Sequence, residues 1–219
     1  MNIISAPLLI LLPSVSALDP VNIGSSCNNA ILSKSGVTNT GPTQIDGNVE
    51  TSSITATDLT GFALVPTNAG TAGFFTSTMV SGRLYGASHM APTPVWLGAA
   101  VLDMEAAYTE ASGRPSPDFV EPYASSIPTY TVLTPGIYKW TSVVTVPVYG
   151  LITFDGRGNA DAVWIMQIAG NLAINSGAAV LLANGAKAEN ILWAVHTDIA
   201  VGIYAHAEGI MLTYTMIAL

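Results

Sequence analysis

The chain has 219 residues, a length that suits one domain or two small ones. Only 9% of its residues are charged, half are apolar, and the formal net charge is −8. These values exclude a disordered chain, a coiled coil and a basic nucleic-acid-binding protein, because each class needs charges that this sequence lacks. With so few charged residues, the surface must be covered mainly by Thr, Ser, Asn, Gly and Ala.

The first 17 residues are typical of a secretory signal peptide. An apolar stretch at 8–12 is followed by Pro13 and by the small residues Val15, Ser16 and Ala17, in the positions that signal peptidase reads. The stretch is too short to span a bilayer, and a buried N-terminal strand is the structural alternative. We therefore expect a signal peptide at 1–17, one domain at 18–219, a secreted, extracellular location and no membrane partner.

Cysteine use limits how the fold is stabilised. Cys27 is the only cysteine, so no internal disulfide can form. We expect a small buried thiol at this position. Packing and hydrogen bonding must then supply the stability of the chain.

One segment has clear helical periodicity. Thr93 offers a capping hydroxyl, Pro94 suits the first helical position, and Gly113 suits the end of the helix. Between them the apolar residues recur at spacings of 4, 3 and 4, namely Leu97, Val101, Met104 and Tyr108. The sequence therefore predicts one helix over about 94–112 with a single apolar face, which must pack against another part of the fold.

The segments after this helix are short strands of two kinds. Continuous apolar runs at 163–168, 191–195 and 210–212 are typical of strands buried on both faces. Alternating segments at 171–175, 198–202 and 216–219 follow them. The apolar runs recur at intervals of 28 and 19 residues, which indicates stacked coils of a β-solenoid with the helix as outer cover. A β-sandwich is the competing fold, although it explains the helix and the two-sided apolar runs less well.

Catalytic and metal-binding patterns are weak. The histidines His89, His196 and His206 have no metal-ligand spacing. The most compact charged group, Asp155, Arg157 and Asp161, lies in a Gly-rich stretch and is interpreted as a solvated turn with a local ion pair. Polysaccharide-acting β-helix enzymes need clustered carboxylates. We expect no enzyme activity, no metal site and no cofactor, and we interpret Trp164 and Trp193 as core.

Four segments carry a family resemblance. They are DMEAAY at 103–108 with Ala111 and Gly113-Arg114 after it, LTPGIYKW at 133–140, VWIMQIAG at 163–170 and NGAKAENILW at 184–193. Together they resemble the microbial ice-binding proteins, a secreted antifreeze family of cold-adapted fungi, algae and bacteria, from about Val21 to Leu219. The resemblance implies a mainly β fold, an irregular right-handed β-solenoid with the long helix along one side. It also implies a monomer whose partner is the ice crystal surface, with no cofactor and no catalysis.

Strand alternation nominates the residues of the ice-binding face. Small outward side chains on a solenoid face form a rigid grid that can order water. The nominated positions are Asn171, Ala173 and Asn175 in one coil, Asp198, Ala200 and Gly202 in the next, Met216 and Ala218 in the last, and Ser35, Asp46 and Asn48 near the N-terminus. The structural alternative is that these residues merely suit the outside of a tight solenoid.

Two departures from the family pattern affect the expected face. The family usually has about one more coil beyond Leu219, so we expect an uncovered edge at the last strand. Thr213-Tyr214-Thr215-Met216 also places bulky groups where the family has small ones.

A function of another class stays open. The same scaffold could serve as an extracellular adhesin or carbohydrate-binding module without ice activity. Ordered exposed aromatic residues would favour sugar binding, whereas a flat face of small residues would favour adsorption to ice with thermal hysteresis and inhibition of ice recrystallisation.

Overall fold

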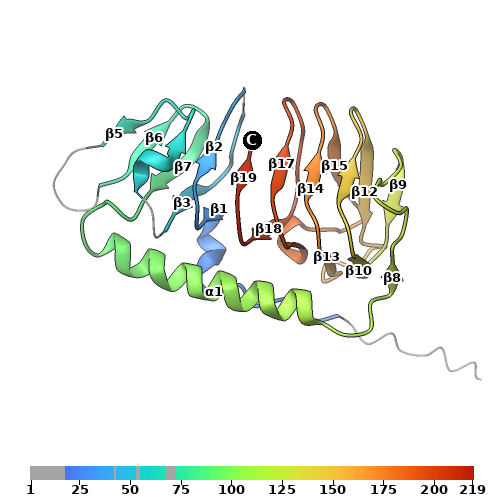
Figure 1. Cartoon of the computed structure of the whole chain (residues 1–219). Coiled ribbons are helices and arrows are strands. Elements are labelled where there is room, and N and C mark those ends of the chain that lie inside the picture. The colour runs from blue at the N-terminus through green and yellow to red at the C-terminus, as the bar shows by residue number, and fades with distance from the viewer. Residues whose placement is uncertain (1–17, 42, 53–54, 68–72) are drawn as a thin grey trace, which may run out of the picture.

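The computed structural model describes residues 18–41, 43–52, 55–67 and 73–219. The predicted signal peptide at 1–17 therefore lies outside the described residues. The chain forms four sheets in which strands of successive coils lie side by side, and one long helix runs along them (Figure 1). The prediction of a mainly β fold with one long helix is confirmed.

After the helix, the chain winds through three parallel sheets in a fixed order, and each complete turn is here called a coil. The helix-side sheet contains β8 (Phe119–Val120), β10 (Gly136–Trp140), β13 (Trp164–Ile168), β16 (Ile191–Val195) and β18 (Ile210–Thr213). The long sheet receives β11 (Val144–Val146), β14 (Leu172–Ile174), β17 (Ile199–Val201) and β19 (Ile217–Ala218). The three-stranded sheet contains β9 (Thr131–Leu133), β12 (Leu151–Asp155) and β15 (Ala179–Ala183).

The N-terminal part adds strands to the long sheet and forms a sheet of its own. The long sheet continues from β19 to β2 (Val37–Thr38) and β4 (Leu59–Thr60), both parallel to it. The N-terminal sheet contains β1 (Asn29–Ser33), β3 (Asn48–Thr51), β7 (Val80–Tyr85), β6 (Phe75–Ser77) and β5 (Val65–Pro66). Short 3-10 helices complete the fold, namely η1 (Gly24–Asn28), η2 (Ala56–Asp58) and η3 (Ala188–Asn190).

The continuous apolar runs of β13 and β16 are buried on both faces, as predicted. The same prediction is wrong for the run at 210–212, because Ile210 and Met211 are only partly buried. In β13, Trp164 and Met166 point into the core enclosed by the coils, whereas Ile165 points toward the helix. Trp164 and Trp193 are fully buried and both meet the ring of Phe154 edge-on, with centroids 5.5 and 5.7 Å apart. The tryptophans are therefore core residues.

The helix α1 (Thr93–Gly113) covers the outer side of the helix-side sheet. The predicted apolar residues Leu97, Val101, Met104 and Tyr108 are all buried. The predicted cap is wrong. Thr93 already belongs to the helix, Pro92 precedes it, and no side chain caps the first turn.

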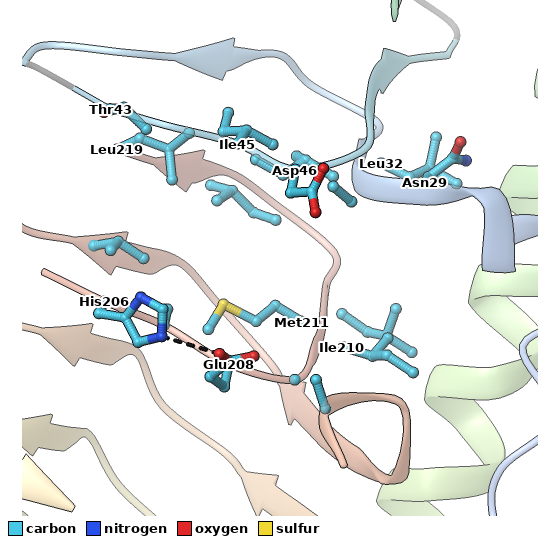
Figure 2. Close-up of a pocket in the computed structure, with 18 of the residues that line it drawn as sticks. Asn29, Leu32, Thr43, Ile45, Asp46, His206, Glu208, Ile210, Met211 and Leu219 are labelled. Atoms are coloured by element: carbon cyan, nitrogen blue, oxygen red, sulfur yellow. Dashed lines mark hydrogen bonds and ion pairs between the residues drawn. The ribbon is translucent and has the colours of Figure 1, made fainter. Parts of the chain in front are cut away.

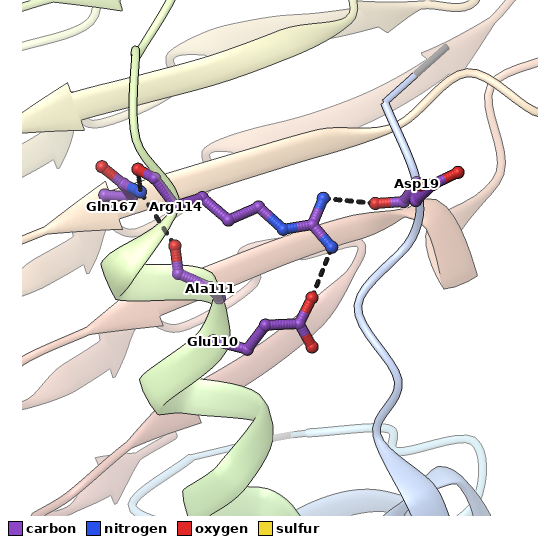
Figure 3. A network of polar contacts seen from close by, with 5 residues as sticks. All are labelled: Asp19, Glu110, Ala111, Arg114 and Gln167. Atoms are coloured by element: carbon purple, nitrogen blue, oxygen red, sulfur yellow. Dashed lines mark hydrogen bonds and ion pairs between the residues drawn. The ribbon is translucent and has the colours of Figure 1, made fainter.

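The C-terminal end of α1 is held by polar contacts (Figure 3). The buried Gln167 side chain donates from Nε2 to the carbonyl oxygens of Ala111 and Arg114, over 2.8 and 3.0 Å. The Arg114 guanidinium in turn donates to the carbonyl of Asp19 and contacts the carboxylate of Glu110. A residue of the sheet thus satisfies helix carbonyls that have no partner within the helix.

The expected uncovered edge is not at the last strand. β19 pairs with β17 on one side and with β2 on the other. The open edges belong instead to β18 and β1, the end strands of the helix-side and N-terminal sheets. A cavity of about 620 Å³ lies there, with Ile210 and Met211 on one side and Ile45 and Leu219 on the other (Figure 2). Because β18 is an end strand, Ile210 and Met211 are only partly buried, unlike the residues of β13 and β16.

Cys27 is exposed in η1, so the prediction of a buried thiol is wrong, because η1 is a short surface turn beside the helix.

Within the described part of the chain, no helix has both the length and the apolar character needed to cross a membrane.

Candidate functional surface

The outer face of the long sheet has one row of small side chains at its centre, here called the central row. Strand register aligns Ser126, Thr145, Ala173, Ala200, Ala218, Thr38 and Thr60 in that order. The residues beside them along each strand, such as Ile199 and Ile217, are buried in the core. Since successive side chains of a strand point to opposite faces, the central row points to solvent.

The central row is long, regular and uncharged. Neighbouring strands are about 4.8 Å apart, so seven aligned residues span about 29 Å. The Thr60 hydroxyl donates to the Thr38 hydroxyl over 3.1 Å, and the Thr145 hydroxyl donates to the Ser125 carbonyl over 3.0 Å. Short side chains on a hydrogen-bonded ladder have few rotamers to lose, so this surface is rigid.

A polar edge flanks the central row on the side where each strand begins. Asn171, Asp198 and Met216 each lie two residues before a row member and therefore on the same face. The Thr197 hydroxyl donates to Asn171 Oδ1, and the Thr215 hydroxyl donates to Asp198 Oδ1 over 2.5 Å. A hydroxyl from the next coil thus fixes each of these two side-chain oxygens.

Ser35 continues this edge into the N-terminal part. It is exposed and its hydroxyl donates to the carbonyl of Thr215, over 2.5 Å. This contact joins residues that lie 180 positions apart in the sequence. Ser35 therefore lies beside the last coil, two residues before the start of β2.

Asn175 and Gly202 form the opposite edge, where the chain leaves the sheet. Asn175 Nδ2 donates to the Val146 carbonyl over 3.0 Å, so its amide is used to join two coils. A Cβ on Gly202 would lie 2.4 Å from the backbone nitrogen of Ser176, so this position needs glycine for close approach. Both residues shape the corner of the face.

Asp46 and Asn48 do not lie on the long sheet. Asp46 Oδ1 accepts a hydrogen bond from the Ser81 hydroxyl over 2.6 Å, and Asn48 Oδ1 accepts one from the backbone of Arg83 over 3.0 Å. Both contacts belong to the N-terminal sheet and the loop before it. The structure thus brings together nine of the nominated residues and separates these two from them.

Four residues of the central row were not nominated from the sequence, namely Ser126, Thr145, Thr38 and Thr60. The signal that could have found Thr38 and Thr60 is weak, because each follows a single buried aliphatic in a strand of two residues. Their place beside the last coil depends on a pairing between β2 and β19 that sequence order does not indicate.

The titratable side chains of the described residues offer no metal site. Within the described residues, no three His, Cys, Asp or Glu side chains are grouped so that they could hold a metal ion. Asp155 Oδ1 accepts hydrogen bonds from the Arg157 backbone and the Asn184 side chain, over 2.8 and 2.9 Å, and these contacts lower the pKa of Asp155. This segment is a turn, as predicted, but these two hydrogen bonds hold it. The predicted local ion pair is wrong, because Arg157 contacts Asp155 through its backbone nitrogen and not through its guanidinium.

Comparison with known proteins gives consistent matches over most of the chain. A family model described as "Ice-binding-like" matches residues 31–219. An ice-binding protein from Leucosporidium sp. (strain AY30) is 42% identical over 199 residues, which cover 91% of this chain and 74% of that protein. Ice-binding protein K1-A from Typhula ishikariensis is 40% identical over 204 residues, which cover 92% of this chain and 81% of that protein.

The fold has a close match among solved structures. The crystal structure of a glycosylated ice-binding protein from an Arctic yeast superimposes with a TM-score of 0.80 at 38% sequence identity. The superposition covers 91% of each chain.

Proposed function

This chain belongs to the ice-binding-like family, and from that premise we propose that it adsorbs to ice through the outer face of the long sheet. The observation that carries the proposal is the central row of seven small, uncharged residues in strand register. Ice is a periodic, rigid and neutral surface, and this face is periodic, rigid and short of charge. The proposed ligand is therefore the crystal surface of ice.

The physical basis of adsorption is the ordering of water over the face. Methyl groups of Ala and Thr restrict the positions that surface water can take, while hydroxyl, amide and carboxylate oxygens anchor part of it. Long charged side chains would move and would lose rotamer entropy on binding. The fixed oxygens of Asn171 and Asp198 supply anchors that need no such ordering.

The proposed contact surface follows from this geometry. It contains the central row together with the polar edge formed by Asn171, Asp198 and Ser35, and with the apolar Met216 on the same edge. Asn175 and Gly202 border it and keep the corner tight, while Asp46 and Asn48 lie outside it. Adsorption through this surface would produce thermal hysteresis and inhibit ice recrystallisation.

Several finer properties belong to the same proposal. We infer a right-handed β-solenoid, because about 98% of connections between parallel strands of one sheet are right-handed. The mature chain would start at Leu18 after cleavage of the signal peptide and act outside the cell as a monomer. Its function would be adsorption without catalysis or cofactor, since a flat neutral grid binds a surface and holds no reacting group.

A bulky substitution in the middle of the central row tests the proposal. Ala200→Tyr places an aromatic ring on the face, so ice activity should fall by about tenfold, equivalent to about 1.4 kcal/mol of adsorption free energy. The measurement is inhibition of ice recrystallisation by residues 18–219, with thermal unfolding followed on the same sample.

The matched control is Ala183→Tyr, which places the same ring on the outer side of the three-stranded sheet. We expect this variant to keep full ice activity. Equal activity of a folded Ala200→Tyr variant would remove the long sheet from the binding surface.

A further inference from the structure

A second surface row lies where the chain turns from the long sheet to the three-stranded sheet, along the upper edge of the molecule in Figure 1. Its members each lie four residues after a residue of the central row, namely Tyr130, Tyr149, Gly177 and Tyr204. The backbone of Tyr149 donates to the Ser176 carbonyl over 3.1 Å, and that of Gly177 to the Ile203 carbonyl over 2.9 Å. These four positions of adjacent coils are here called the tyrosine row.

The backbone at the tyrosine row is in the left-handed region. The φ angles are 63° at Tyr130, 55° at Tyr149, 68° at Gly177 and 59° at Tyr204. Glycine adopts such a φ without penalty, whereas a bulky side chain rarely does, at a cost on the order of 1 kcal/mol each. Tyrosine at three of four equivalent turns is thus unfavourable for the fold.

Packing does not compensate for this strain. The three tyrosines are 77%, 81% and 78% exposed, so they bury little surface. Val148 and Ile203, which precede Tyr149 and Tyr204, are also exposed. These side chains form an apolar ridge that carries phenolic hydroxyls. Exposed aromatic surface of this kind is typical of binding sites.

The Tyr149 ring extends along the row toward the next coil. A Cβ on Gly177 would lie 2.4 Å from Cδ1 of Tyr149, so the Tyr149 ring lies over Gly177 and covers the position that has no side chain. The backbones of Tyr149 and Tyr204 are two coils apart, about 9.6 Å, and those of Tyr130 and Tyr149 are one coil apart, about 4.8 Å. These distances are close to the disaccharide and monosaccharide repeats of an extended β-linked glycan.

We propose that the tyrosine row binds a neutral, β-linked polysaccharide by stacking of its rings on the apolar faces of successive sugars. A linear polymer fits a convex line of rings, whereas a small ligand needs a concave site. The row contains no charged residue, and a net charge of −8 disfavours acidic polymers. Ice is an unsuitable ligand for this ridge because protruding rings do not form a flat grid.

The test is retention of the purified chain on insoluble cellulose and chitin, compared with a Tyr149→Asn/Tyr204→Asn double variant. Asparagine tolerates a left-handed φ, so the variant should fold with an unchanged or higher melting temperature. Loss of two stacking contacts should weaken retention on at least one polymer by about tenfold. Inhibition of ice recrystallisation should stay unchanged, which separates this proposal from the proposed function.

The matched control is Tyr123→Asn, because Tyr123 also has a positive φ of 64° and is exposed but lies outside the row. It should leave retention unchanged, as should Ala200→Tyr. Absence of wild-type retention on both polymers, or equal retention of the double variant, would overturn the proposal. So would a dimer in sedimentation that the double variant abolishes, because a second copy would then be the occupant.

Discussion

At the scale of single residues, one buried acid affects stability. Glu50 lies on β3, is 1% exposed, and its Oε2 has no hydrogen-bond partner. Burial raises the pKa of Glu50 to about 7, an effect that the Asn29 side chain partly offsets. The sequence offers no signal for this, since a single Glu in a polar stretch is usually an exposed side chain.

The raised pKa predicts a stability that depends on pH. Between the pKa of the unfolded chain, near 4.5, and about 7, the folded protein holds a proton that the unfolded chain has lost. The free energy of unfolding should therefore fall by about 3 kcal/mol as pH rises through this window. Urea unfolding of Glu50→Gln should lack this fall and show higher stability at pH 8.

An exposed acid provides the control for this measurement. Glu189→Gln should leave the pH profile of the wild type unchanged, because its side chain is largely exposed. A Glu50→Gln profile parallel to that of the wild type would contradict the assignment.

At the scale of elements, the helix depends on a side chain from the sheet that it covers. Gln167→Met keeps the size of the side chain but removes the donor to the Ala111 and Arg114 carbonyls. Leaving buried acceptors unpaired should cost about 2 kcal/mol in the free energy of unfolding. Lys139→Met is the comparison, because Lys139 is the strand neighbour of Gln167 and is exposed. Chemical denaturation showing equal stability for both variants would argue against this cap.

The predictability of each element follows from its length and pattern. The apolar face of α1 and the apolar runs of β13 and β16 are long enough to be identified from their sequence pattern, and they are correctly predicted. Strands of two residues such as β2 and β4 contain no period. Alternation predicts which side chains of a segment share a face, and it identified Ala173, Ala200 and Ala218 on the long sheet. A pattern within one segment cannot predict which sheet the segment joins, and Asp46 and Asn48 contact the N-terminal sheet instead.

At the scale of the whole molecule, the proposed ice-binding face is assembled from two distant parts of the sequence. Ala218 and Thr38 are adjacent in the central row although 180 residues separate them. Thr38→Tyr should therefore reduce inhibition of ice recrystallisation by about as much as Ala200→Tyr, roughly tenfold. Ser112→Tyr, on an exposed position of α1, should have no effect. Full activity of a folded Thr38→Tyr variant would limit the face to β11, β14, β17 and β19.

The pairing of β2 with β19 also has a kinetic consequence. The Leu219 backbone donates to the Thr38 carbonyl over 3.0 Å and the Thr40 backbone donates to the Leu219 carbonyl over 2.8 Å, so these bonds close a loop of nearly the whole described chain. Contacts of such high sequence separation slow folding, because chain entropy is lost before they form. During synthesis, β2 is translated early, but it cannot pair with β19 until nearly all coils have been translated. The long sheet should therefore become continuous only after translation of the last coil.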